Sequence, residues 1–172
     1  MTHGNKKLTD TDKDIAQKLL DWLTDYSKIA VVGIGNELRQ DDFVGSHIVR
    51  NLKKVVSSDK ILILDCETVP ENYLSVIERF KPSHILVIDA AQTGLEPGKY
   101  TLVGFEKVRG EGISTHDLSL EIFAKYIKKV TDAKLILLAI QPKSVEFETG
   151  LTEELAKTAK EITDLLSKVL IQ

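Results

Sequence analysis

Short apolar runs alternate along this chain with segments of helical periodicity. The runs lie within residues 28–35, 60–65, 84–89 and 134–140, and the first three end in glycine or aspartate. Runs of this length and composition are typical of strands that are buried on both faces. Parallel strands need long crossover connections, which helices usually provide. The alternation therefore predicts an α/β fold, a three-layer α/β/α sandwich around a mainly parallel sheet.

Helical periodicity fills the intervals between these runs. Apolar residues recur at helical spacing in residues 12–26, 43–56, 70–80, 117–129 and 152–170. Thr152 is the expected N-cap of the last helix. We expect one domain, residues 1–172, in which residues 1–27 form a helical appendage packed outside the sandwich.

A further, shorter strand is expected at residues 99–105. It follows the turn-forming sequence Glu96-Pro-Gly98. The connection from the strand at residues 84–89 is too short to contain a covering helix. This strand is therefore expected to run antiparallel to the others.

Charge and cysteine content exclude several classes of function. The 172 residues include 23 basic and 26 acidic side chains, a net charge of −3, which argues against binding to nucleic acid or to an anionic membrane surface. From the sequence we expect neither a membrane-spanning helix nor a secretory signal. Cys66 is the single cysteine, so the chain has no internal disulfide, and we expect a reducing, cytoplasmic location.

Two aspartates and a histidine are the candidate site. In open α/β sheets, ligands bind beyond the carboxyl ends of the strands, where the winding reverses. The first strand leads into the loop with Asp41 and Asp42, and the third ends at Asp89. If the strand order begins 2-1-3, then Asp42 and Asp89 face each other, and His116 can complete the group. Two carboxylates and an imidazole suit a divalent cation such as zinc or nickel.

Each of these residues also has a purely structural interpretation. Asp42 precedes a helix and can be its N-cap, and Asp89 can cap backbone amides in the turn that follows its strand. His116 can be an incidental loop histidine. Gly33-Ile-Gly35 begins like a dinucleotide-binding fingerprint, but the third glycine position of that motif is Leu38. Cys66 is expected to be a small, partly buried residue rather than a nucleophile.

The sequence Gly33-Ile-Gly-Asn-Glu-Leu-Arg-Gln-Asp-Asp-Phe-Val-Gly45 resembles the opening motif of the hydrogenase maturation endopeptidases. These enzymes remove a C-terminal extension from the large subunit of nickel–iron hydrogenases after nickel insertion. The resemblance covers nearly everything from Ile29 to the last helix. It continues through Asp65, Val69-Pro-Glu-Asn72, Ile88-Asp-Ala90, Leu95-Glu-Pro-Gly98 and the Ser-Thr-His-Asp segment around His116.

The resemblance implies a fold and a site. It implies a five-stranded sheet of order 2-1-3-5-4 with strand 4 antiparallel. It implies that Asp42, Asp89 and His116 bind nickel, which the substrate precursor carries, with no tightly held organic cofactor. One departure is Asp65-Cys-Glu67 where the family often has Asp-Gly-Gly, and the added bulk can narrow the cleft or change which precursor is accepted.

Catalysis is expected to depend on Asp42 and Asp89. Either the metal or one of these aspartates activates a water molecule, or the aspartates act directly and the metal serves only for recognition. Asn36 and Asp41 are expected to contact the substrate, although a turn-stabilising role for Asn36 is equally compatible with the sequence.

Two other functions remain open at this point. One is a non-catalytic chaperone for the nickel centre. The other is an esterase similar to the peptidyl-tRNA hydrolases, which share a Gly-x-Gly-Asn opening but need a basic surface for the tRNA backbone. The expected partner is a hydrogenase large-subunit precursor, without nucleic acid or membrane, and the chain is expected to be a monomer.

Overall fold

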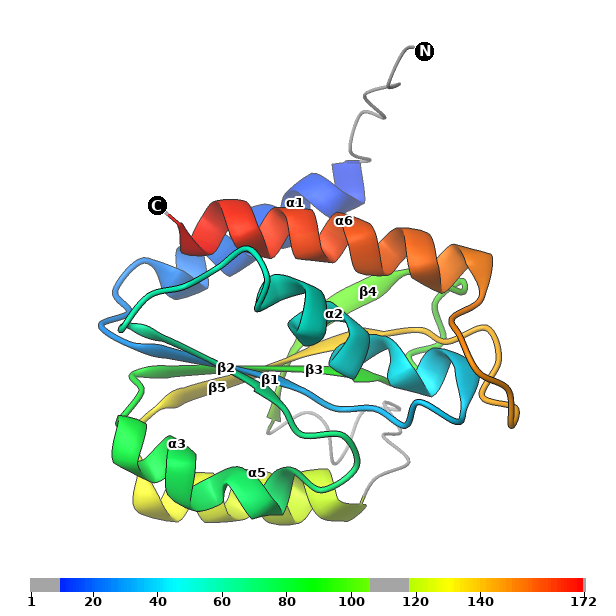
Figure 1. The fold of residues 1–172 in the computed structure, drawn as a ribbon. Helices are drawn as coiled ribbons and strands as arrows, with labels where there is room; N and C mark the ends of the chain where they lie inside the picture. The colour runs from blue at the N-terminus through cyan, green and yellow to red at the C-terminus, as the bar shows by residue number, and fades with distance from the viewer. Residues whose placement is uncertain (1–9, 106–117, 172) are drawn as a thin grey trace.

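A five-stranded sheet forms the centre of the fold (Figure 1). The structure is a computed structural model that describes residues 10–105 and 118–171. The strand order is β2-β1-β3-β5-β4, in which β4 is antiparallel to β5 and the other pairs are parallel. This confirms the predicted fold class and strand order. The strands are β1 (Ile29–Gly33), β2 (Ile61–Asp65), β3 (His84–Ala90), β4 (Tyr100–Gly104) and β5 (Lys134–Ile140).

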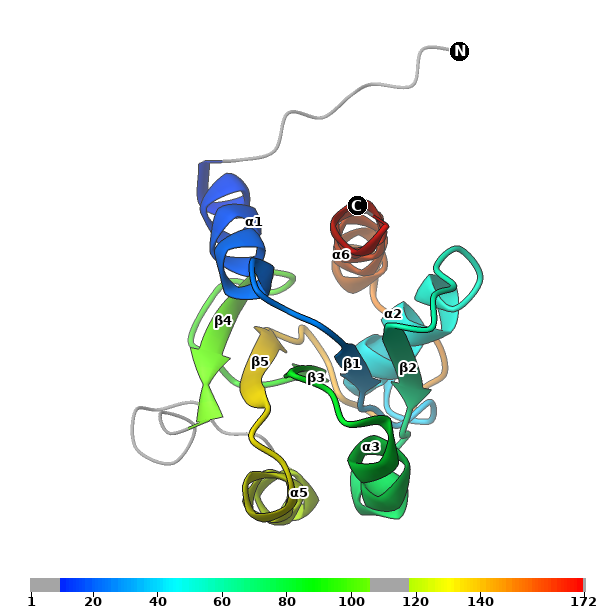
Figure 2. The same ribbon diagram turned by 90° about the vertical axis from the view of Figure 1, so that its left-hand side faces the viewer.

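Helices cover both faces of this sheet. Viewed along the strands, α1, α2 and α6 lie on one side and α3 and α5 on the other (Figure 2). Two 3₁₀ turns, η1 (Gln40–Phe43) and η2 (Pro70–Tyr73), come directly before α2 and α3. The helices are α1 (Asp10–Leu23), α2 (Val44–Leu52), α3 (Leu74–Phe80), α5 (Leu118–Val130) and α6 (Glu153–Leu170). Within these described segments, no helix is long and apolar enough to cross a membrane.

Strands β1 and β3 are buried along their whole length, which explains their continuous apolar sequences. Successive side chains point to opposite faces of the sheet. Ile29 and Val31 pack in the cluster under α1, α2 and α6, whereas Ala30 and Val32 pack in the cluster under α3 and α5. The fold thus has two apolar cores, one on each side of the sheet.

Helix α1 belongs to one of the helical layers. It was expected instead to be an appendage outside the sandwich. Ile15, Leu19 and Leu23 recur every four residues, and all three are buried in the same apolar cluster as residues of α6. The apolar pattern indicated which face of α1 is buried. What that face covers depends on residues distant in the sequence.

Two helices differ in their bounds from the prediction. The helix expected at residues 43–56 is present as α2, which begins at Val44 after the 3₁₀ turn of residues 40–43 and ends at Leu52, four residues before the predicted end. The segment 70–80 was expected to be one helix, but residues 70–73 form a 3₁₀ turn. Pro70 stands at the start of its turn, where its missing N–H group costs nothing. Thr152 is the N-cap residue of α6, as predicted, but its side chain makes no capping hydrogen bond.

His84 joins α1 to the sheet at the amino end of β3. Its ring is buried and packs edge-on against Trp22, with 4.8 Å between ring centroids, and against Tyr26 at 6.5 Å. Nδ1 lies 2.9 Å from Oγ of Ser83, and Nε2 lies 3.3 Å from a carboxylate oxygen of Asp25. Burial, assisted by the charge of Lys134, lowers the pKa of His84.

Candidate functional site

A cleft of about 230 Å³ opens at the carboxyl ends of β1 and β3. Asp42 and Asp89 both line it, so the structure brings together the two aspartates that the sequence placed at this edge. This is also the edge at which open α/β sheets bind their ligands. The other lining residues are Ile34, Gly35, Asn36, Arg39, Thr68 and Ala90.

Close backbone packing gives the cleft its shape. Gly45 lies in the first turn of α2, and a Cβ atom there would collide with the carbonyl oxygens of Ile34 and Ile88. The N–H of Ile34 also donates to the carbonyl of Ile88 at 3.0 Å. The start of α2 therefore lies directly against the ends of β1 and β3. This contact places Asp42, three residues before Gly45, beside the cleft.

Asp42 is held by the loop that follows β1. Its Oδ2 accepts a hydrogen bond from the N–H of Asn36 at 3.0 Å, and its own N–H donates to the carbonyl of Arg39 at 3.0 Å. Asn36 in turn accepts a bond from the N–H of Leu38 through Oδ1, at 2.9 Å. Asn36 thus stabilises the turn and also lines the cleft, so its position is compatible with both predicted roles.

Asp89 comes from the sheet itself. It pairs with Ala139 in the ladder between β3 and β5, and only 4% of its surface is exposed. A carboxylate on a central strand is positioned more firmly than one on a loop. The cleft therefore combines one carboxylate fixed by the sheet with one fixed by the turn of residues 36–42.

The third predicted metal ligand, His116, lies outside the described residues. Among the residues that are described, no group of three or more His, Cys, Asp or Glu side chains could hold a metal ion. The described part of the cleft supplies two carboxylates, which are suitable ligands for a divalent cation but are too few for a closed site. The donor set fits a cation only if a further ligand comes from elsewhere.

Asp41 has a position different from the one expected. Its side chain is completely buried, so it cannot contact a substrate in this structure. Oδ2 accepts bonds from the N–H groups of Lys143 and Ser144, at 2.9 and 3.0 Å. Oδ1 accepts bonds from the N–H and the hydroxyl of Thr152, at 2.8 and 2.9 Å. Asp41 thus connects the loop after β1 with the loop after β5 and with the start of α6.

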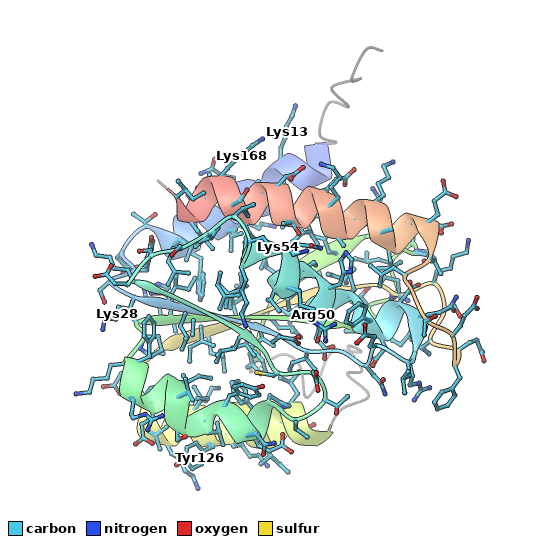
Figure 3. All side chains as sticks on the ribbon, viewed as in Figure 1. Lys13, Lys28, Arg50, Lys54, Tyr126 and Lys168 are labelled. Carbon is cyan, nitrogen blue, oxygen red and sulfur yellow. The ribbon has the colours of Figure 1, made fainter. Side chains whose placement is uncertain are left out.

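A second hollow of about 170 Å³ adjoins the cleft and shares Gly35, Asn36 and Thr68 with it. Arg50, labelled in Figure 3, lines this hollow from α2. Its guanidinium donates to Asp65 at 2.6 Å and to Glu37 at 3.2 Å. The bond to Asp65 is the main reason why the pKa of Arg50 is raised.

Residues 65–67 explain how the chain tolerates its departure from Asp-Gly-Gly. Glu67 has a φ of +49°, the left-handed conformation that glycine adopts most easily. Its side chain reaches Arg50, with 3.6 Å between Oε1 and Nη2. Cys66 is fully buried, and burial raises the pKa of its thiol to about 12. Burial thus disfavours a reactive thiolate at Cys66, in line with the expectation that it is not a nucleophile, and it is more complete than the partial burial that the sequence predicted.

Arg39 and Thr68 line the cleft but were not singled out from the sequence. Arg39 lies within the opening motif, two residues before Asp41, so the motif itself was a signal for it. Thr68 belongs to the loop after β2. That loop could be assigned to the cleft only once β2 was known to lie beside β1.

Comparison with known sequences identifies the family. The family model for hydrogenase maturation protease matches residues 46–169. A Methanocaldococcus jannaschii protein assigned to the hydrogenase maturation proteases is 32% identical over 161 residues, which cover 90% of this chain and 95% of that protein. The hydrogenase 3 maturation protease of Escherichia coli is 26% identical over 121 residues, which cover 70% of this chain and 76% of that protein.

Solved structures agree with this assignment. The crystal structure of a NiFe hydrogenase maturation protease from Thermococcus kodakarensis superposes with a TM-score of 0.84 and 34% identity, covering 90% of this chain and 99% of that one. A hydrogenase maturating endopeptidase from E. coli superposes with a TM-score of 0.68 and 27% identity, covering 81% and 89%. The chain therefore belongs to the hydrogenase maturation protease family and is a peptidase.

Proposed function

We propose that this peptidase removes the C-terminal extension of a NiFe hydrogenase large-subunit precursor after nickel has been inserted. The observation that supports the proposal is the cleft that contains Asp42 and Asp89, in a chain of this family. The names of its relatives refer to the maturation of hydrogenases, and that of the T. kodakarensis protein refers to the NiFe enzymes.

Nickel enters this proposal as part of the substrate. Asp42, Asp89 and His116 offer ligands to the nickel centre of the precursor and hold it beside the scissile bond. A precursor without nickel lacks this interaction, so it binds more weakly and is not cleaved. An imidazole must be deprotonated to bind a metal, so recognition weakens as the pH falls through the range in which His116 is protonated.

The same two carboxylates provide the general base for hydrolysis of the peptide bond. One of them accepts a proton from a water molecule, and the resulting hydroxide attacks the carbonyl carbon of the scissile peptide. The C–N bond then breaks, and the leaving amine receives the proton from the carboxyl group. Asp42 suits the role of base because the N–H of Asn36 fixes its orientation. Asp89 suits it because β3 positions the side chain and it has little contact with solvent.

The test is cleavage of nickel-loaded precursor by Asp42→Asn, Asp89→Asn and His116→Ala variants, followed by mass spectrometry of the large subunit. We expect each variant to lose at least about 100-fold in cleavage rate, the usual contribution of a positioned acid or base. Asp59→Asn is the matched control, because Asp59 is exposed and lies in the connection between α2 and β2, before the amino end of β2. It should cleave like the unmodified chain.

Two further results decide the proposal. Precursor prepared without nickel should remain uncleaved by the unmodified chain. Full activity of all three site variants would remove the proposed site. Tight binding of nickel-loaded precursor without release of any peptide would instead favour a chaperone for the nickel centre.

A further inference from the structure

Phe147 is exposed in an unusual way. Its side chain has 81% of its surface in solvent, the highest value among the large hydrophobic side chains of the described residues. It belongs to the loop between β5 and α6, which leaves the sheet at the same edge as the cleft (Figure 1). Leu38 is 59% exposed and lies in the loop after β1, at the same edge. We call Leu38 and Phe147 the apolar rim.

The loop that carries Phe147 is firmly attached to the loop that carries Leu38. The N–H of Gln40 donates to the carbonyl of Glu148 at 2.8 Å, and its side chain donates to the Glu148 carboxylate at 3.0 Å. Arg39 donates through Nε to the carbonyl of Val145 at 3.2 Å. The buried carboxylate of Asp41 adds its bonds to the same loop. These hydrogen bonds fix the loop on both sides of Phe147, whose side chain is exposed.

The backbone at Gln40 is strained to make these contacts. Its φ is +39°, a left-handed conformation that costs a residue with a side chain of this size free energy. Such strain persists only where the surroundings impose it, and it is concentrated at functional sites. Here Gln40 makes both of its bonds to Glu148 in that conformation.

Arg39 connects the apolar rim with the cleft. Its guanidinium carbon lies 5.3 Å from the centre of the Phe147 ring, within the range of a cation–π contact. The same residue lines the cleft together with Asp42 and Asp89. Arg39 thus contacts Phe147 of the apolar rim and also lines the cleft, so the rim adjoins the cleft.

Further apolar side chains are exposed along this edge. Val69, in the loop after β2, is 37% exposed, and Leu95, in the loop after β3, is 42% exposed. An aromatic side chain on a rigid loop gives a large contact area at a small cost in entropy when a partner binds. A substrate that presents an apolar surface beside its cleavage site would cover these residues.

We propose that the apolar rim binds an apolar surface on the folded body of the precursor, beside the extension, and so positions the extension in the cleft. This inference rests on the proposed function, because it takes the precursor as the substrate. The extension itself occupies the cleft between Asp42 and Asp89. The rim lies outside that cleft, so its partner is the folded part of the precursor.

The test compares Phe147→Ala, Leu38→Ala and Tyr126→Ala in cleavage of nickel-loaded precursor. Tyr126 is the matched control: it is also an exposed aromatic residue, but it lies on the outer side of α5 (Figure 3). For Phe147→Ala we expect KM to rise about 10- to 30-fold while kcat stays within about twofold, as for loss of binding that is equal in the ground and transition states. Leu38→Ala should raise KM about threefold to tenfold. Phe147→Tyr should retain the KM of the unmodified chain.

The outcomes separate this inference from the proposed function. If the unmodified chain cleaves precursor and Phe147→Ala has an unchanged KM, the apolar rim is not the docking surface. If Phe147→Ala changes the molecular mass in solution from dimer to monomer without changing KM, the rim binds a second copy of the chain and the proposal is overturned. If the unmodified chain does not cleave nickel-loaded precursor, the proposed function is wrong, and the inference that rests on it is wrong as well. The unfolding midpoint of Phe147→Ala should match that of the unmodified chain, because the side chain is exposed.

Discussion

Replacement of Asp41 by asparagine tests whether this residue has a structural role. The carboxylate is buried and accepts bonds from three backbone N–H groups and one hydroxyl, which belong to Lys143, Ser144 and Thr152. An asparagine has one acceptor oxygen in place of two. In its better orientation this oxygen faces Lys143 and Ser144, and the amide group faces Thr152, whose hydroxyl can rotate to accept.

The expected loss of unfolding free energy follows from the number of N–H groups that lose their acceptor. Asp41→Asn leaves one N–H group, that of Thr152, without its acceptor, which costs about 1–3 kcal/mol of unfolding free energy. Asp41→Ala leaves all three N–H groups, for a sum of about 3–9 kcal/mol. These groups are only partly buried, so water can replace some of the lost bonds, and we expect about 3–5 kcal/mol.

Urea denaturation followed by circular dichroism measures both changes. The exposed Asp59→Asn control should stay within about 0.5 kcal/mol of the unmodified chain. Amide hydrogen exchange should accelerate more than exchange in the central strands, at residue 152 in Asp41→Asn and at residues 143, 144 and 152 in Asp41→Ala. Unchanged stability of Asp41→Asn, together with unchanged exchange at these three amides, would refute the assignment of Asp41 as a structural anchor.

Two further predictions concern the packing of the sheet. Gly45→Ala should cost about 3 kcal/mol or more in urea denaturation because its Cβ meets backbone carbonyl oxygens, whereas Gly94→Ala, with open space but a φ of +74°, should cost about 1–2 kcal/mol; equal effects would contradict the close packing of α2. Burial lowers the folded-state pKa of His84 below 6.5, so the unfolded chain takes up this proton at a higher pH than the folded chain, and stability falls as the pH drops from about 6.5 toward the folded-state pKa. His84→Gln should flatten this part of the curve of unfolding free energy against pH, and an unchanged slope would contradict the prediction.

Most of the fold was accessible from the sequence because its signals are local. Strands β1 and β3 are buried on both faces, and this condition produces the continuous apolar runs at residues 29–33 and 84–90. The antiparallel direction of β4 followed from the short connection around Gly98. The complete strand order came from the family resemblance, since apolar runs alone do not define which strands are neighbours.

The roles of the two adjacent aspartates were not accessible in the same way. Asp41 and Asp42 are chemically identical and stand next to each other, yet one is buried and the other lines the cleft. The partners that bury Asp41 are 102 to 111 residues away in the sequence. Both aspartates lie in the 3₁₀ turn of residues 40–43, which the sequence did not predict and in which Asp41 is buried. Neither the distant partners of Asp41 nor this turn is indicated by the residues that are close to it in the sequence.

The contact at Gly45 affects two properties at once, the packing of the core and the geometry of the cleft. The helix that follows Asp42 touches the backbone of both strands that flank the cleft, including the residue directly before Asp89. Any larger side chain at this point would have to push the helix away from the sheet, and the spacing of the two carboxylates would widen with it. Selection for heat resistance alone should therefore leave this glycine unchanged, because the same contact sets both the tightness of the core and the geometry for peptide cleavage.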